Sequence, residues 1–309
     1  MATRRLSAFG FRLSAGVLAV IAMTAAADAQ PAAPAKITVG IYAPSVEFGA
    51  AQARLAYVQA LAKAIEQNSG IKTEAQSYAN VGALRKDNVD FAIIEGQCYA
   101  TNLGWKLLAN ANIGGTTRAW ALFAAAGESM QALRGKKLAF VQTGCSDAAF
   151  VDNAMLESEV EPTFFGARIG KADLTATIAE VASYKNADVV FAPVGSAKGL
   201  VKVIDTGSVP TPAFVALNAK LPAAVVDKVG AAVIGFGGGG AIAGWTKPAR
   251  EPYVALAARL GKAVKAPILA APEPVRVDGK DVLLEPPTLR DSAAVVVRHH
   301  FVRPVGSRM

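Results

Sequence analysis

The apolar run Val89-Asp90-Phe91-Ala92-Ile93-Ile94-Glu95 (residues 89–95) is the clearest structural signal in this chain. Its centre shows no alternation of apolar and polar residues, which is typical of a parallel β-strand covered on both faces. On its amino-terminal side the sequence predicts a strand over 37–42, a helix over 54–67, a strand over 72–78 and a short helix over 81–85. This order begins a doubly wound α/β sheet, in which binding residues lie on the loops after the strands, here 43–49 and 96–102.

A second strand–helix–strand unit follows the first. Its expected elements are strands over 118–126 and 138–141, a helix from 147 to about 157, a strand that begins within 161–165, a helix over 174–181 and a strand over 187–192. Farther along, 210–217 is expected to be extended, and 222–235 and 251–264 to be helical. The expected fold class is therefore α/β, with two nested sheet-and-helix units.

Residues 1–29 are predicted to be a signal peptide. Arg4, Arg5 and Arg12 precede an apolar run over 13–23, and Ala27-Asp28-Ala29 is a small-x-small cleavage site. The run is too short to anchor the mature chain, so we expect a periplasmic protein without a membrane span. The formal net charge of +8 becomes about +6 once the three leader arginines and Asp28 are removed. This modest charge, without a Lys/Arg run, argues against a nucleic-acid partner.

The mature chain carries a series of short phrases in a regular order. They are Ile37-Thr38-Val39-Gly40-Ile41, Leu84-Arg85-Lys86 before Val89-Asp90-Phe91-Ala92, Leu133-Arg134-Gly135-Lys136-Lys137-Leu138-Ala139-Phe140, the loop 143–146, Pro162-Thr163-Phe164-Phe165 and Asn186-Ala187-Asp188-Val189-Val190. In order and spacing they resemble the phosphate/phosphonate-type solute-binding proteins of ABC importers, a branch of the type II periplasmic-binding fold. The resemblance covers roughly residues 36–262.

The resemblance implies a two-lobed molecule whose lobes each contain a mostly parallel sheet flanked by helices. Two hinge strands would join the lobes, near 118–121 and 210–215, and hinge motion would close them on a small-molecule ligand. Lobe one would span 36–117 plus 214–265, and lobe two 118–213. The implied protein is a monomer without a cofactor, and its partners are the membrane subunits of an ABC importer.

Residues 266–309 lie outside the resemblance and form a C-terminal extension. Within it, 275–284 is expected to form a hairpin with an Asp-Gly turn, and 293–301 a further strand. The extension either covers a sheet edge or docks a partner protein, and we favour the first interpretation. His299 and His300 are adjacent, so their side chains point apart and no metal pair is expected.

The loop Thr143–Asp147 lies between a strand and the start of a helix. Free backbone N–H groups at such a position attract an anion or a polar ligand atom, and the Thr143 and Ser146 hydroxyl groups would add hydrogen bonds. The alternative is that Ser146 or Asp147 only caps the helix. Both roles are compatible with one loop, so the alternative stays open at this stage.

Further candidates come from the ends of the other strands. Polar residues there have little reason to be buried, and aromatic residues offer contact area. The candidate ligand-binding residues are therefore Tyr42, Glu95, Gln97, Tyr99, Thr143, Gly144, Ser146, Asp147 and Thr175. Phosphonate-binding relatives carry a histidine near the position of Thr175 and a carboxylate near that of Pro193, and both are absent here. We therefore expect a less charged or more apolar ligand than phosphonate.

Cys98 and Cys145 are the only two cysteines, and the implied fold places them on cleft loops of opposite lobes. An oxidising periplasm favours a disulfide. A bond across the cleft requires Cα atoms within about 7 Å and would lock the lobes, which argues for two free buried thiols. Joint metal coordination is the third alternative, but no histidine precedes His299 to complete the site.

Three classes of function fit this sequence. The first is a binding protein that delivers a solute to an ABC importer, and the second is an accessory or sensor protein of a periplasmic oxidoreductase system. The third is an enzyme, which we reject because no nucleophile–base pair can be recognised. The glycine cluster 235–240 matches a dinucleotide fingerprint, but it lacks the strand–turn–helix context that such a site needs.

Overall fold

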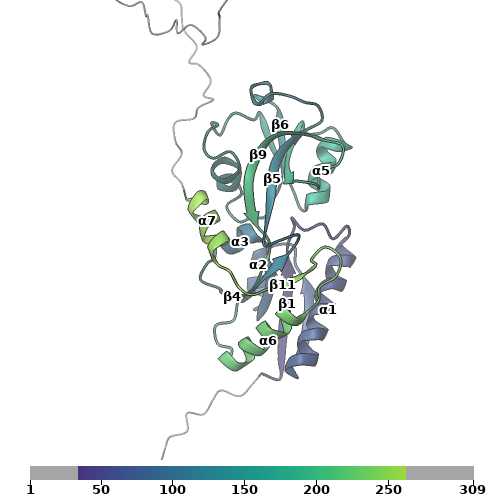
Figure 1. Cartoon of the computed structure of the whole chain (residues 1–309), viewed down its shortest axis with the longest axis vertical. Helices are drawn as coiled ribbons and strands as arrows, with labels where there is room; N and C mark the ends of the chain where they lie inside the picture. The colour runs from purple at the N-terminus through teal and green to yellow at the C-terminus, as the bar shows by residue number, and fades with distance from the viewer. Residues whose placement is uncertain (1–33, 262–309) are drawn as a thin grey trace, which may run out of the picture.

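The computed structural model describes residues 34–261 and arranges them in two lobes, stacked one above the other in Figure 1. Each lobe is built on one sheet, with strand order β11-β4-β10-β3-β1-β2 in lobe one and β7-β6-β8-β5-β9 in lobe two. The expected α/β class and two-lobed type II periplasmic-binding fold are confirmed. The signal peptide, the hairpin and strand of the extension, and the histidine pair lie outside the described residues.

Lobe one begins with the parallel strands β1 (Lys36–Tyr42), β2 (Lys72–Ser77) and β3 (Phe91–Ile94). The antiparallel strands β10 (Ala213–Ala216), β4 (Lys106–Asn112) and β11 (Gly244–Thr246) complete its sheet. Helices α1 (Ala51–Ser69) and α6 (Ala223–Gly235) pack on each other and on this sheet. The short helices α2 (Val81–Lys86) and α3 (Gly96–Ala100) follow β2 and β3.

The helical pattern of α1 explains why it covers the sheet. Tyr57, Val58, Leu61, Ala62 and Ile65 recur at helical spacing and are buried, and all but Ala62 belong to one cluster with apolar side chains of β1 and β3. The helix ends at Gly70, which has a φ of +73° and therefore the left-handed conformation that glycine adopts without strain. The chain then reverses into β2, whose pairing with β1 is parallel.

Lobe two contains β5 (Thr117–Ala124), a 3-10 turn (Met130–Leu133), β6 (Lys137–Val141), α4 (Asp147–Ala149) and a π-helical turn (Phe150–Met155). It continues with β7 (Ala167–Lys171), α5 (Leu174–Ala182), β8 (Val189–Pro193) and β9 (Val201–Pro210). The chain crosses between the lobes twice, from β4 to β5 and from β9 to β10.

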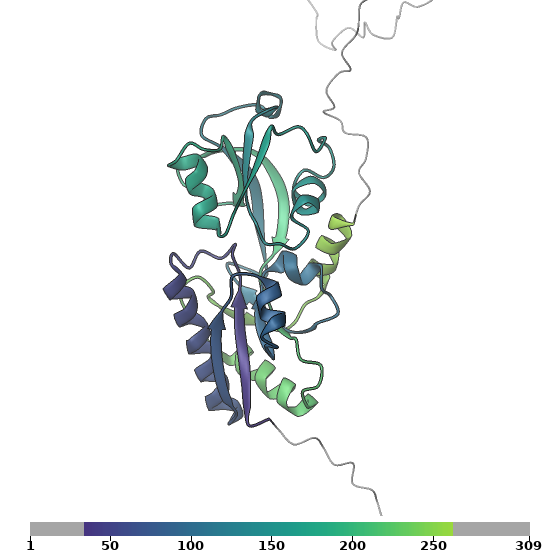
Figure 2. The same ribbon diagram turned by 180° about the vertical axis from the view of Figure 1, so that it is seen from behind.

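Helix α7 (Glu251–Leu260) lies against the junction of the lobes, on the side opposite to α1 and α5 in both views (Figures 1 and 2). It contacts α3, β9 and the π-helical turn. Tyr253 donates to Thr211 O and accepts from Asn110 Nδ2, while Arg259 donates to Ser208 O. Helix α7 therefore holds both lobes on the hinge side of the molecule.

Several expected elements differ from the structure. The rim loop over 96–102 contains helix α3, and the strand expected to begin within 161–165 is wrong because the chain forms β7 only from Ala167. Phe164 and Phe165 are buried core residues in an edge-to-face pair, so their apolar character reflects packing rather than strand pairing. Strands β4, β9 and β11 were not predicted. Within 34–261, no helix is both long and apolar enough to cross a membrane.

Candidate functional site

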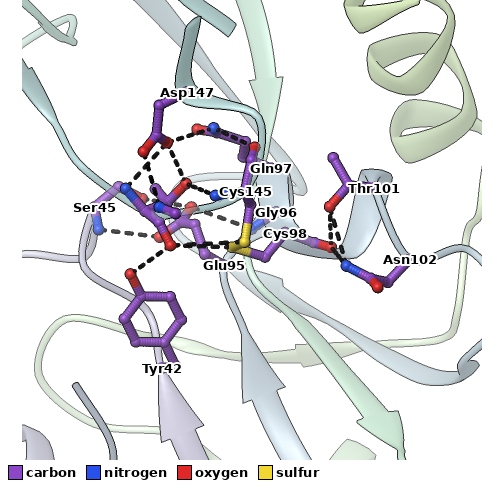
Figure 3. Close-up of a disulfide and its surroundings, with 12 residues drawn as sticks. Tyr42, Ser45, Glu95, Gly96, Gln97, Cys98, Thr101, Asn102, Cys145 and Asp147 are labelled. Atoms are coloured by element: carbon purple, nitrogen blue, oxygen red, sulfur yellow. Dashed lines mark hydrogen bonds between the residues drawn. A yellow bond between two sulfur atoms is a disulfide. The ribbon is translucent and has the colours of Figure 1, made fainter. Parts of the chain in front are cut away.

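Helix α3 and the loop after β6 meet across the lobe boundary, where the implied fold places Cys98 and Cys145 (Figure 3). Cys98 of α3 and Cys145 of the loop form a disulfide, with their Cα atoms 5.0 Å apart. Of the three alternatives for these cysteines, the structure therefore has the disulfide. The bond joins lobe one to lobe two as a covalent link beyond the two chain crossings.

The loop Thr143–Asp147 places a carboxylate of its own where an anion was expected. Asp147 accepts hydrogen bonds from Thr143 N at 3.1 Å, Thr143 Oγ1 at 2.6 Å and Gly144 N at 2.8 Å. The expectation that these N–H groups are free is therefore wrong. Ser146 is exposed, has a φ of +60° and makes no side-chain cap, so the alternative that Ser146 caps the helix is wrong. The Asp147 carboxylate accepts from the loop instead.

Two side chains of lobe one bond to this loop directly. Gln97 donates through Nε2 to Cys145 O at 2.7 Å and to Asp147 Oδ1 at 2.9 Å. Tyr42, at the end of β1, donates its hydroxyl to Thr143 O at 2.9 Å. Burial raises the pKa of Tyr42, and the neighbouring Glu95 and Asp147 carboxylates raise it further, so the hydroxyl stays a donor at neutral pH.

Glu95 is the buried carboxyl group of the interface. It accepts from Ser45 Oγ at 2.7 Å, from Ser45 N at 3.0 Å and from Gly96 N at 3.1 Å. Desolvation raises its pKa, and the hydrogen bonds from Ser45 and Gly96 and the charge of Arg118 offset only part of that effect. Glu95 therefore fixes the loop after β1 in place, and it does so within lobe one.

The space between these groups is small. A cavity of about 10 Å³ is lined by Ser45, Glu95, Gln97, Trp120, Val141, Thr143, Phe150 and Val209. A cavity of this size holds about one water molecule. The deep part of the cleft is thus filled by protein side chains, and ligand contact by Glu95, Gln97 and Thr143 stays a prediction.

A larger groove lies between the lobes beside this contact. It has a volume of about 290 Å³, and lobe one lines it with Pro44, Val46, Phe48, Gly49, Ala50, Ala51 and Arg54, while lobe two contributes Asp173, Thr175, Ala176, Ala179 and Tyr184. Leu174 N donates to Pro44 O at 3.0 Å, so the two walls of the groove touch each other through backbone atoms. Arg54 Nε donates to Ser77 Oγ at 2.8 Å.

The candidate residues therefore divide into separate groups. Thr175 is exposed and lines the groove, whereas Tyr42 and Asp147 are engaged in the contact between lobes. Tyr99 lies in the core, where its ring packs on Tyr253 at a centroid distance of 4.7 Å. Gly144 faces a second surface groove next to the disulfide.

Arg54 and Tyr184 are groove residues that sequence reasoning missed. Arg54 belongs to the first turn of α1, directly after the rim loop 43–49, so its position relative to the strand end was a usable signal. Tyr184 follows the end of α5 and offers no comparable signal. Among residues 34–261, no cluster of three or more histidine, cysteine or acidic residues is arranged to hold a metal ion.

No protein-family model matches this chain, and no curated protein matches it. Among solved structures it is similar to the binding protein of a phosphonate ABC transporter from Pseudomonas aeruginosa, at 13% identity and a TM-score of 0.54, covering 69% of this chain and 81% of that one. A Prochlorococcus marinus protein in complex with methylphosphonate is similar at 12% identity and a TM-score of 0.58, covering 73% and 97%. A Xanthomonas citri protein bound to ATP matches at 13% identity and a TM-score of 0.55, covering 74% and 97%. At these identities the likeness shows the fold: this chain has the type II periplasmic-binding fold of phosphonate-type binding proteins.

Proposed function

We propose that this protein is a periplasmic, non-enzymatic binding protein that holds a small solute in the groove between α1 and α5 and delivers it to an ABC importer. The observation that carries the proposal is the groove itself, because both lobes line it. A ligand that touches both lobes stabilises the closed form by its differential affinity for the two states. The volume of about 290 Å³ is at the lower end for ligand sites, so the solute is small.

The lining residues describe the kind of solute that fits. Apolar surface from Val46, Phe48 and the alanines surrounds one cationic group, Arg54, and one acidic group, Asp173. Each charged group has one bonded atom, since Asp173 Oδ1 accepts from Ala176 N and Arg54 Nε donates to Ser77 Oγ, and Arg54 is the cationic group that the groove offers to an anion. A small, mostly apolar molecule with one polar or anionic group matches this surface. Methylphosphonate and ATP, which the similar structures bind, would meet fewer donors here because Asp147 uses those of the loop after β6.

The disulfide favours a second candidate function. A link between Cys98 and Cys145 and a deep cavity of about 10 Å³ leave little room for the large opening that solute exchange in the deep cleft would need. An accessory or sensor protein of a periplasmic oxidoreductase system uses its surface instead of its cleft, and such a role tolerates a closed interface.

Native mass spectrometry of the protein purified from its own periplasm tests the proposal. We expect a bound small molecule on the wild type and its loss from Thr175→Trp, because the new indole fills the groove. Gln59→Trp is the matched control, since Gln59 is exposed on α1 outside the groove. An unliganded wild type, or retention of the molecule by Thr175→Trp, contradicts solute binding in this groove, and a co-purifying protein without a small molecule favours the accessory role.

A further inference from the structure

We propose that Cys145 is a redox modification site, where an incoming thiolate opens the Cys98–Cys145 disulfide and thereby releases the two lobes from each other. The inference goes beyond solute binding and does not depend on it. It is carried by the unequal burial of the two sulfur-bearing residues, by a groove that reaches only one of them, and by the inter-lobe contacts that the disulfide accompanies.

The two cysteines differ in access. Cys98 is fully buried, whereas Cys145 keeps 7% of its surface exposed. A groove of about 320 Å³ runs beside Cys145, and its walls come from α2, from the end of α3 and from the loop after β6. Cys98 is absent from the residues that line this groove. Of the two bonded residues, Cys145 is therefore the one that reaches the surface and a groove.

The opposite side of the disulfide is covered. Thr143 O lies 3.6 Å from Cys145 Sγ and 3.9 Å from Cys98 Sγ, and the Tyr42 hydroxyl bonds to the same oxygen at 2.9 Å. The end of α3 is also held, because Thr101 Oγ1 and Asn102 Nδ2 both donate to Cys98 O. Thr143 and Tyr42 do not line the groove, so approach from the groove leaves their hydrogen bond in place.

The groove carries a positive charge at its wall. Arg85 of α2 is exposed, lines the groove and donates to Asn102 Oδ1, and no acidic residue belongs to the lining. A guanidinium group at this position attracts an anionic thiol and stabilises the thiolate form that performs the attack. Asp147 is the acidic residue nearest to Cys145 in the sequence, and its carboxylate accepts hydrogen bonds from Thr143, Gly144 and Gln97.

The chemical step is a thiol–disulfide exchange. A thiolate forms a bond to Sγ of Cys145, the bond between the two cysteines breaks, and Cys98 leaves with the electron pair and takes a proton from water. A second thiol then attacks the external sulfur of the mixed disulfide and releases the Cys145 thiolate. The net result is a protein with two reduced cysteines and one disulfide formed from the two reductant thiols, so the co-reactant is a thiol reductant.

Reduction removes the covalent link and leaves the inter-lobe hydrogen bonds, among them the bond from Gln97 to the Asp147 carboxylate, and the ion pair between Arg118 and Glu47. Leu174 N donates to Pro44 O at 3.0 Å across the lobe boundary, so its amide reports on lobe separation. Ala176 N, in the same helix, donates to Asp173 Oδ1 inside lobe two and is the matched internal control. Opening exposes the Leu174 amide to solvent exchange and leaves the Ala176 amide unchanged.

Two measurements test the proposal on the full-length mature chain. In the first, the oxidised protein is mixed with reduced glutathione, quenched with acid and mapped by peptide mass spectrometry. We expect glutathione on Cys145, and roughly fivefold slower reaction of Arg85→Gln at low salt, with the rate kept in Arg85→Lys and in the neighbouring control Lys86→Gln. Dithiothreitol, which is uncharged, should react equally with all of them. Glutathione on Cys98, or equal rates for Arg85→Gln and wild type, overturns the assigned attack site.

The second measurement is residue-resolved hydrogen exchange with and without reductant. We expect roughly tenfold faster exchange of the Leu174 amide after reduction, with Ala176 unchanged. The variant Cys98→Ala/Cys145→Ala should show the same faster exchange without reductant. Unchanged exchange of Leu174 when both thiols are free shows that the disulfide does not hold the lobes together and overturns the proposal. Neither readout involves a solute, so failure of groove binding is a separate result.

Discussion

Replacing both cysteines with alanine should lower the free energy of unfolding, because it removes the disulfide between Cys98 and Cys145. The disulfide closes a chain segment with a sequence separation of 47, which runs from α3 through β4, β5 and β6. In the chain-entropy model, a loop of that size lowers the entropy of the unfolded state enough to contribute about 4 kcal/mol at 25 °C. The observed range for native disulfides, roughly 2–5 kcal/mol, brackets this value.

Urea unfolding, followed by tryptophan fluorescence and by circular dichroism, measures the loss. We expect Cys98→Ala/Cys145→Ala to lose about 4 kcal/mol of unfolding free energy, and the wild type in reductant to lose a similar amount. The single variant Cys145→Ala should fall close to the double variant, because either substitution abolishes the same bond. A loss below about 1 kcal/mol, or alkylation of both thiols in the untreated wild type, would refute the reasoning.

Three further substitutions probe the lobe interface. Gly96→Ala should destabilise the protein by roughly 2–3 kcal/mol in urea unfolding, because a Cβ at Gly96 would lie 2.1 Å from Pro210 O. The control Gly104→Ala, whose Cβ would have no atom within 4 Å, should be near neutral, and equal effects of the two would contradict the packing argument. Asp147→Ala should lower the free energy of unfolding by about 2 kcal/mol, because the Thr143 and Gly144 amides lose their acceptor. The control Asp205→Ala removes an exposed carboxylate paired with Lys202 and should cost less than about 0.5 kcal/mol; equal losses in the two variants would rule out the loop role of Asp147. Burial raises the pKa of Glu95 above 4.5, so the protonated carboxyl group favours the folded state. The free energy of unfolding is therefore highest below pH 4.5 and falls as the pH rises through the folded-state pKa of Glu95. Glu95→Gln should therefore gain on the wild type between acidic and neutral pH in unfolding experiments, and a constant difference would show that the Glu95 pKa is not raised.

The elements that could be predicted are those whose apolar residues follow the pattern that burial requires, a helical repeat in α1 and a continuous run in β3. Helix α1 and strand β3 are covered by other layers, so their apolar residues recur as burial requires. Strand β9 lies at the edge of its sheet, and its sequence, which includes Asp205 and Ser208, has no apolar alternation to detect. Strand β9 was therefore missed because pairing with a neighbour, rather than burial of both faces, brings it into the sheet. Strand β4 is buried inside its sheet, but its Leu, Ala and Asn residues lack the β-branched and aromatic character typical of strands.

The candidate site was predictable only in part. Cys98 and Cys145 each follow a strand, and the carboxyl ends of strands in the two lobes face each other, so their meeting followed from topology. The direction of the Asp147 side chain did not follow, because it depends on the left-handed conformation of Ser146. Nor did the groove around Thr175, whose shape depends on how far the lobes close.

The contact between the lobes fills the deep cleft with groups of the protein itself. Asp147 supplies the negative charge that the loop amides would otherwise take from a ligand, and Gln97 reaches that charge from the other lobe, as a bridging ligand would. A protein whose own carboxylate makes these contacts has less to gain from an anion at the same place, because the anion must first displace Asp147. Control of opening then passes from the ligand to the bond between Cys98 and Cys145, which is the one inter-lobe contact near the loop that water cannot replace.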